Sequence, residues 1–180
     1  MVETIRVGHL LRETVAAPYR NLVTRPTGAA VRTRIEAALA ASNCRTALLD
    51  FSGIELLDLS CADEIVAKLL LADAGRLLPC VVLQGLREDQ HEAIDHVLTH
   101  HRLAIAAVPP GEAEPRLLGW ISSDARTAFT CVGEEGPMSA ARIAERLGWP
   151  EVRSRLALED LTRHRLVRAE ADLYHPLPMA

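Results

Sequence analysis

A serine, two aspartates and a strand-to-helix transition coincide in LDFSGIELLDLSCADEIV, residues 49–66. Asp58, Ser60 and Asp63 lie where the apolar run gives way to the pattern of a first helical turn. As a helix N-cap, Ser60 would accept a backbone N–H of that turn, and Asp63 would lie at the positive end of the helix dipole. As a phosphoacceptor, Ser60 would gain charge beside free N–H groups and repel both aspartates, which would alter a docking surface. Stability alone accounts for a cap, so the cap is the simpler interpretation.

A second candidate set is Arg153, Ser154 and Arg155, in the helical pattern PEVRSRLALEDLTRHR at residues 150–165. Arginine can bond guanine bidentately, and serine can contact bases or phosphates. These three residues are therefore candidates for DNA contacts. From Trp120 onward, however, arginines and acidic residues nearly balance, whereas DNA affinity depends on neutralised phosphates. Binding to another protein is the alternative for this helix.

Histidines offer weaker chemistry. His96 and His100 have the i, i+4 spacing that can chelate a metal, but no further ligand of obvious spacing completes the site, and solvated helix surface is the expectation. The sequence holds no nucleophile elbow and no phosphate-binding or dinucleotide-binding glycine loop. We therefore predict a non-enzymatic protein with no cofactor and no metal. The four cysteines form no C-x-x-C pair and are expected to be reduced.

The strand-to-helix transition at Ser60 belongs to an α/β domain, which we expect over residues 1–108. Two short β-branched stretches, residues 4–11 and 19–25, are predicted to pair as strands. Helical patterns and buried apolar runs then alternate, which implies a sheet with parallel neighbours and helical crossovers. The predicted helices cover residues 28–41, 60–78 and 87–102, and the predicted strands cover residues 45–54, 79–86 and 103–108.

Prolines and glycines at residues 109–119 predict a linker. After it, residues 120–180 are predicted to form a small domain of three helices and a β-hairpin. The helices are expected at residues 122–136, 137–149 and 150–165, and the hairpin turns at Glu170–Asp172. This layout is that of a winged helix-turn-helix, in which the third helix would enter the major groove of DNA.

Two resemblances accompany these patterns. ARIAERLG and LALEDLTRHRLVR are similar to bacterial winged-helix regulators, which usually have glycine where this chain has Arg165. LVTRPTGAAVRTRIEAAL, TALLDFSGIELLDLSCADEIVAKLL and PCVVLQGL resemble the STAS domain of anti-sigma-factor antagonists, over about residues 5–108. That family carries an Asp-Ser-Ser-Gly turn whose second serine is phosphorylated. The matching residues here are Asp58, Leu59, Ser60 and Cys61.

The STAS resemblance implies a regulatory role and, as partner, a histidine-kinase-like ATPase that is also an anti-sigma factor. Double-stranded DNA is the partner implied by the winged-helix resemblance, and a homodimer would suit such a regulator. The alternative is a protein-interaction subunit of a larger complex that binds no DNA. The 180 residues carry a formal charge of −4 and show neither a signal peptide nor a membrane-spanning apolar run, so we expect a cytoplasmic protein.

Overall fold

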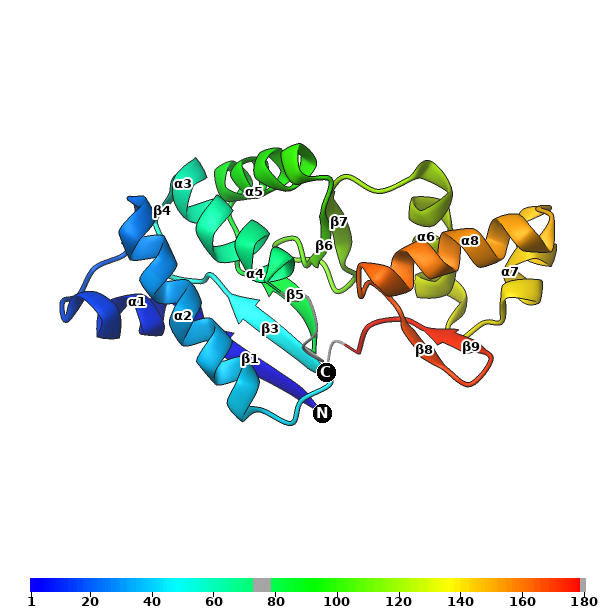
Figure 1. Cartoon of the computed structure of the whole chain (residues 1–180), viewed down its shortest axis with the longest axis horizontal. Coiled ribbons are helices and arrows are strands. Elements are labelled where there is room, and N and C mark those ends of the chain that lie inside the picture. The colour runs from blue at the N-terminus through cyan, green and yellow to red at the C-terminus, as the bar shows by residue number, and fades with distance from the viewer. Residues whose placement is uncertain (73–78, 179–180) are drawn as a thin grey trace. The chain divides into compact units, whose positions relative to one another are not determined.

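The computed structural model describes residues 1–72 and 79–178, which form two compact units that divide after Trp120 (Figure 1). Both helices and strands are present, and the main sheet mixes parallel and antiparallel pairing. The α/β class expected from the sequence is therefore confirmed.

The first unit is built on a sheet of five strands. Their order is β1 (Val2–Arg6), β3 (Thr46–Asp50), β5 (Cys80–Gln84), β6 (Ala104–Ala107) and β7 (Arg116–Gly119). The first four strands run parallel, and β7 pairs antiparallel with β6. Leu49 of β3 pairs with Ile5 on one side and Leu83 on the other, and all three side chains are buried. Residues 46–49 of β3 and all four residues of β6 are buried, so these central strands are nearly continuous apolar runs.

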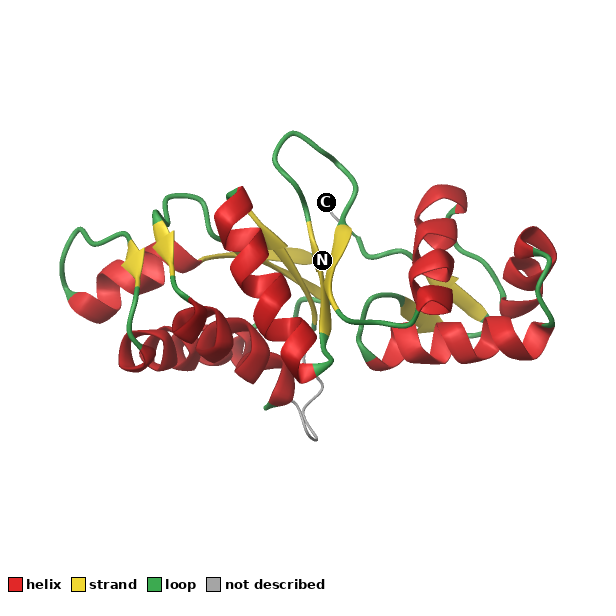
Figure 2. Ribbon diagram, turned by 90° about the horizontal axis from the view of Figure 1, so that it is seen from above, coloured by secondary structure: helices red, strands yellow, loops and turns green. Residues whose placement is uncertain are grey.

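The helices of this unit pack against one another, and all but the first, which continues from the end of β1, lie against the sheet (Figure 2). They are α1 (Val7–Val15), α2 (Arg25–Ala41), α3 (Leu59–Ala62), the π-helical η1 (Asp63–Ala67), α4 (Lys68–Leu71) and α5 (Glu88–His101). Each crossover joins a strand to its immediate neighbour, so crossovers of one hand place the helices that cover the sheet on the same face. The hydrophobic core lies between these helices and the sheet. The expected helix at 60–78 is present as α3, η1 and α4, and its residues 73–78 lie outside the described residues.

The predicted pairing of the first two stretches is wrong. β1 pairs with β3, and residues 7–15 form α1 because Val7 and Leu11 bury one helical face. β2 is only Asn21–Leu22 and pairs with β4 (Leu56–Leu57), in parallel. The β-branched residues gave a strand signal, but burial at a four-residue spacing decided for a helix.

The linker predicted at 109–119 is also wrong in its second half, because residues 116–119 form β7. The prolines mark a loop between two antiparallel strands, and such a loop uses the same residues as a domain boundary. Gly119 has φ 92°, and a Cβ there would lie 2.1 Å from the Leu103 carbonyl oxygen. This glycine therefore permits a close backbone approach, and the two units divide after Trp120 instead.

The second unit contains α6 (Ser123–Glu135), α7 (Ala140–Leu147), α8 (Glu151–Arg163) and the antiparallel hairpin of β8 (Arg168–Glu170) and β9 (Leu173–His175). The serines at 122 and 139 cap α6 and α7. Arg165 has φ 56°, the left-handed conformation that favours glycine. The buried side chains that hold the helices together come from all three of them and from the segment before β8: Ala128, Val132, Ile143, Leu158, Leu161 and Leu166.

Candidate functional site

The transition that contains Ser60 lies between β4 and α3. Asp58, not Ser60, is the N-cap of α3, so the sequence interpretation of Ser60 as the cap is wrong. The Asp58 Oδ1 atom accepts the backbone N–H of Cys61 at 2.7 Å and the hydroxyl of Ser60 at 2.8 Å. Ser60 is the second residue of the helix, and its hydroxyl donates to the capping carboxylate. Aspartate and serine are about equally favourable as N-caps, so residue type alone could not predict which of the two caps α3.

The same carboxylate also receives a bond from α2. Asp58 Oδ2 accepts the N–H of Thr24, the N-cap of α2, at 3.2 Å. The short β2–β4 ladder makes this contact possible, because the N–H of Asp58 donates to the Leu22 carbonyl at 3.0 Å. Two helix N-termini thus converge on one carboxylate, which satisfies their free N–H groups and complements both dipoles.

Thr24 holds a backbone conformation that threonine rarely adopts, with φ 74° and ψ 135°. Its carbonyl accepts the Cys61 thiol, with Sγ at 3.1 Å, and its hydroxyl pairs with that of Thr27 at 3.0 Å. Gly28 lets α2 approach closely, since a Cβ there would be 3.1 Å from the Cys61 Cα atom. Strain of this kind persists only where surrounding contacts determine the conformation.

Burial and hydrogen bonding set the titration of this cluster. Burial acts to raise the pKa of Asp58, but the donors from Cys61, Ser60 and Thr24 outweigh it and leave the pKa lowered. Asp58 is therefore a stable carboxylate and a poor proton acceptor for Ser60. Burial and the neighbouring Asp58 charge raise the pKa of Cys61 to about 12. The Cys61 thiol is consequently unreactive near neutral pH.

Two leucines flank the Asp58–Ser60 pair and are exposed. Leu56 of β4 is 50% exposed, and Leu59, the first residue of α3, is 51% exposed. Ser60 itself is half-buried. We call Leu56, Asp58, Leu59 and Ser60 the α3 surface. Two exposed leucines thus lie beside an ordered polar pair on this surface.

Behind the α3 surface, Asp63 and Glu64 anchor an ion network. The Glu64 side chain is only 3% exposed and contacts three cations: Arg25 at 2.8 Å, Arg32 at 3.0 Å, and Lys68. Arg25 also bonds Asp63 at 2.8 Å, which brings the carboxylates of η1 to the first turn of α2. The three cations thereby offset the desolvation cost of burying the Glu64 carboxylate.

Asp63 has a second partner in α5, because its Oδ1 lies 2.7 Å from His101 Nε2. Burial acts to raise the pKa of Asp63 and Glu64, but in each case hydrogen bonds from the cations outweigh burial and lower the pKa. Asp63 was predicted as a docking residue. The structure instead places its carboxylate in contacts between helices, where it links η1 to α2 and α5.

The structure separates the three candidate DNA contacts on α8. Ser154 is fully buried, and its hydroxyl donates to the Ala140 carbonyl at 2.8 Å. It holds α8 against the start of α7, so the prediction that Ser154 contacts DNA is wrong. Its position was on the inner face of the helix, three and four residues from buried Ala157 and Leu158.

Arg153 and Arg155 are exposed but already have carboxylate partners. Arg153 forms a bidentate pair with Asp124 of α6, at 2.8 and 2.7 Å, and its guanidinium lies over the Trp149 ring at 4.4 Å. Arg155 pairs with Glu151 at 2.7 Å. Each arginine would have to exchange a carboxylate for a phosphate or a base in order to bind DNA.

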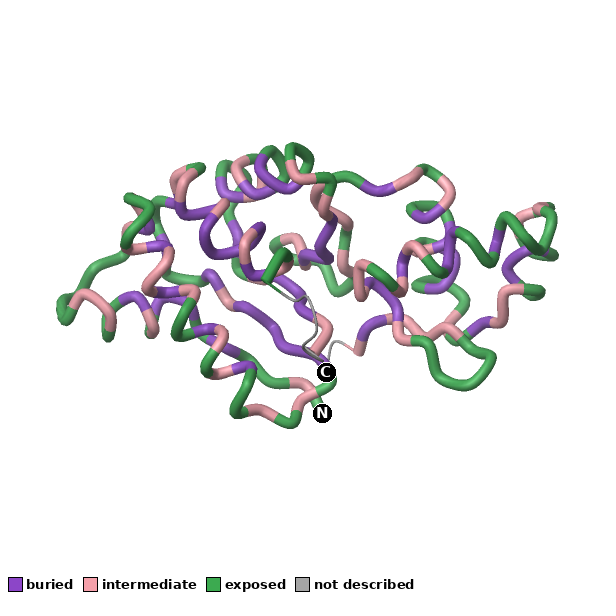
Figure 3. The backbone as a smooth tube through the Cα atoms, viewed as in Figure 1, coloured by how far each residue is buried: buried purple, intermediate pink, exposed green. Residues whose placement is uncertain are grey.

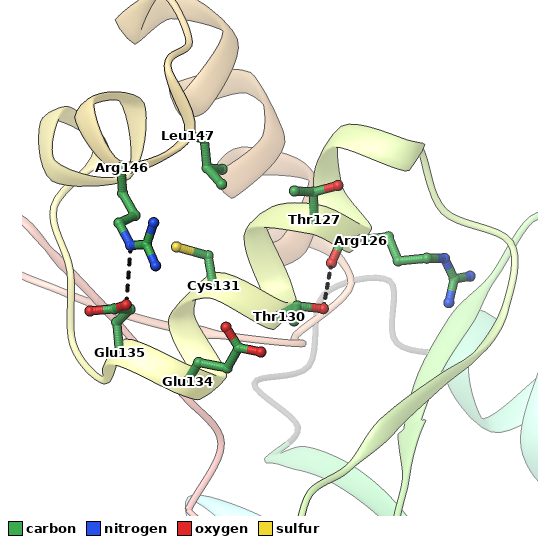
Figure 4. A pocket seen from close by; sticks show the side chains of 8 residues that line it. All are labelled: Arg126, Thr127, Thr130, Cys131, Glu134, Glu135, Arg146 and Leu147. Atoms are coloured by element: carbon green, nitrogen blue, oxygen red, sulfur yellow. Dashed lines mark hydrogen bonds and ion pairs between the residues drawn. The ribbon is translucent and has the colours of Figure 1, made fainter.

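The second unit also has a pocket between α6 and α7 that is lined largely by polar side chains (Figure 4). Arg146 and Glu135 form an ion pair at 3.1 Å across its mouth, and Cys131 points into it. Burial raises the pKa of the Cys131 thiol. The pocket therefore presents no activated nucleophile.

His96 and His100 are exposed on α5, as the sequence predicted, and they line an open hollow with Glu92 and Asp95. Within residues 1–72 and 79–178, no group of three or more His, Cys, Asp or Glu side chains is placed to hold a metal ion. No helix in this part of the chain is long and apolar enough to cross a membrane.

Comparison with known proteins adds no identity: no protein-family model matches the chain, and no curated protein matches it significantly in sequence. Sequence reasoning missed the α3 surface leucines, Thr24 and the Glu64 network. Leu59 gave no signal of its exposure, because it stands three and seven residues before buried Ala62 and Val66, a spacing that predicts burial. Thr24 and Glu64 gave no signal either, since their roles depend on contacts between helices distant in sequence.

Proposed function

We propose that the chain is a non-enzymatic regulatory protein whose first unit docks another protein through the α3 surface. The observation that carries this proposal is the exposure of Leu56 and Leu59 beside the fixed Asp58–Ser60 pair. A partner would bury both leucines and read a hydroxyl whose direction the capping carboxylate already determines. Little ordering would be required on binding, which favours affinity.

The resemblance to anti-sigma-factor antagonists suggests what the partner is and how the surface is switched. A histidine-kinase-like ATPase would bind the α3 surface and phosphorylate Ser60. The phosphate would break the 2.8 Å hydrogen bond to Asp58 and repel that carboxylate. Phosphorylation would therefore change both the charge and the geometry of the surface.

The experiment uses the full chain with a photo-crosslinking residue in place of Leu59, expressed in the source cell. A matched chain carries the same residue in place of Leu173, an exposed leucine of the second unit. We expect one ATPase to be crosslinked from position 59 and not from position 173. Its binding should be weakened by Ser60→Glu and retained by Ser60→Ala, because only glutamate adds charge beside Asp58. Identical crosslinks from both positions would contradict the proposal.

DNA binding by the second unit is a second candidate function. It is favoured by Arg153 and Arg155, which are exposed on the first turns of α8, the second helix of the α7–turn–α8 pair. The test is retardation of random duplex DNA at low salt. Binding that falls steeply with added salt and is lost in the Arg153→Ala, Arg155→Ala double variant supports this function. Undiminished binding by that double variant, or no binding at micromolar protein, would refute it.

A further inference from the structure

The outward face of α8 is unusually apolar for an exposed helix. Val152 is 64% exposed and Leu156 is 61% exposed, and they lie one turn apart. With Glu159 and Arg163 they form a stripe at steps of four, three and four residues, which repeats on one side of a helix. The stripe lies opposite the buried residues of α8, which are Ser154, Ala157, Leu158 and Leu161. Figure 3 shows the alternation of buried and exposed segments along this helix.

A groove borders this stripe. It is lined by Val152 and Leu156 on one side, by Asp124 near the start of α6, and by Asp160 and Arg163 farther along α8. Arg153, which pairs with Asp124, also lines the groove, so a partner side chain placed on the stripe would find a concave surface with charges of both signs beside it. Such a recess next to exposed aliphatic groups is where the strongest contacts of an interface concentrate.

Charges along the exposed side of α8 alternate with a constant spacing. Glu151, Arg155, Glu159 and Arg163 are four residues apart and read minus, plus, minus, plus. Glu151 forms an ion pair with Arg155, and Arg163 forms one with Asp160. The side chains of Glu151, Arg155 and Arg163 are each more than half exposed. In reverse the same order reads plus, minus, plus, minus. Residues four apart drift by about 40° around a helix, so Arg155 and Glu159 lie close to the two aliphatic residues of the stripe, whereas Glu151 lies farther round. A second α8 in antiparallel orientation therefore brings Arg155 of each copy to Glu159 of the other.

We propose that the α8 face is an interface for a second copy of this chain, with the two α8 helices antiparallel about a two-fold axis. Glu159 of one copy then lies beside Arg155 of the other at two symmetric contacts, and the Val152 and Leu156 side chains are covered between them. A parallel pair would place like charges together and is disfavoured. This inference does not depend on the proposed function of the α3 surface.

DNA is the less suitable occupant of this face. A phosphate backbone would meet Glu151 and Glu159, and Val152 and Leu156 would offer it no hydrogen bond. In the antiparallel dimer Glu159 meets Arg155 of the second copy, and Val152 and Leu156 are covered. The pattern therefore favours a protein surface with this particular charge order, which the chain itself supplies.

The interface is small. A helix of thirteen residues is about 20 Å long, so a single antiparallel pair buries less than the roughly 1,600 Å² of a standard interface. We expect a weak dimer with a Kd on the order of 10 µM, in the range of transient complexes. Sedimentation equilibrium of the full chain over a concentration series around this value should show a reversible monomer–dimer equilibrium.

A charge-exchange experiment tests the orientation. Arg155→Glu puts two negative charges opposite each other at both Arg155–Glu159 contacts, and Glu159→Arg puts two positive charges there. Each variant alone should dimerise at least about tenfold more weakly than wild type, whereas an equimolar mixture of the two should regain a wild-type Kd. Leu156→Asp should also weaken the dimer. Glu145→Arg, the same charge change on exposed α7, should leave it unchanged.

Three results would overturn the proposal. The first is a wild-type chain that stays monomeric throughout the concentration series. The second is a dimer that Leu156→Asp and both charge variants leave intact, which would place the interface elsewhere. The third is duplex DNA bound by the monomeric chain and released by Arg155→Glu, which would assign the α8 face to DNA. Circular dichroism of each variant checks that α8 remains folded, and recovery in the mixture is a second check.

Discussion

Replacing Glu64 with glutamine should destabilise the first unit strongly. The Glu64 carboxylate is 3% exposed and holds Arg25, Arg32 and Lys68. Removing one partner of a buried ion pair costs about 3–5 kcal/mol, because the other charge is left without compensation. Arg25 and Lys68 are 52% and 41% exposed and can turn toward water, whereas Arg32, at 22%, cannot do so fully. We therefore expect Glu64→Gln to lower the free energy of unfolding by about 2–3 kcal/mol.

The assay is urea unfolding of the full chain, followed by far-ultraviolet circular dichroism. Glu36→Gln is the matched control, because Glu36 contacts Arg32 at 3.6 Å and is 29% exposed. This control should cost less than about 1 kcal/mol. If Glu64→Gln proves as mild as Glu36→Gln, the network does not hold α2 against η1, and the reasoning fails.

Three further predictions follow from other contacts. The pKa values of Asp58, Asp63 and Glu64 are lowered in the folded state. Their contribution to stability should therefore be complete above an unfolded pKa of about 4 and should fall as pH drops below it. A urea midpoint that stays constant or rises on acidification would contradict this sign. Ser154→Ala removes the hydroxyl that donates to the Ala140 carbonyl and should cost about 1–2 kcal/mol, whereas a surface serine would cost almost nothing in the same unfolding assay. Ala16 ends α1 with φ 51° and is exposed, so Ala16→Gly should raise the free energy of unfolding by about 0.5–1 kcal/mol, and any loss of stability would contradict the assigned backbone conformation.

Much of the fold could be predicted because the buried apolar residues of a helix or strand recur at regular spacing in the sequence. α2, α5 and the helices of the second unit appear within a few residues of their expected bounds, and α2 begins at Arg25 rather than at residue 28. The buried strands β3, β5 and β6 were equally recognisable as apolar runs. These elements are long or central, so their side-chain pattern is set by the core alone.

The errors arose where the sequence signal was short or ambiguous. Val7 and Leu11 are buried at helical spacing within a stretch rich in β-branched residues, and only tertiary packing decides between helix and strand. β7 is four residues long and follows a proline-containing loop, which a sequence cannot distinguish from a linker. The two-residue β2 and β4 lie below the length at which periodicity can be detected.

The candidate site was predicted in location more than in roles. Asp58 and Ser60 do interact, but Asp58 is the N-cap that the sequence assigned to Ser60, because the capping geometry depends on where β4 ends. The contribution of Thr24 could not be foreseen, since it comes from a strained N-cap of another helix, 34 residues away. Ser154 was misassigned because a serine between two arginines looks exposed unless the register of the helix against its core is known.

The central claim is that another protein binds the α3 surface. The most direct measurement is the affinity of the full chain for the protein crosslinked from position 59, compared between wild type, Leu59→Asp and the control Leu173→Asp. Burying a fully exposed leucine contributes about 1.5–3 kcal/mol, and Leu59 is 51% exposed, so Leu59→Asp should raise the Kd by at least about 4- to 10-fold, and Leu173→Asp should leave it unchanged. Equal affinity of all three chains for that protein would contradict the account.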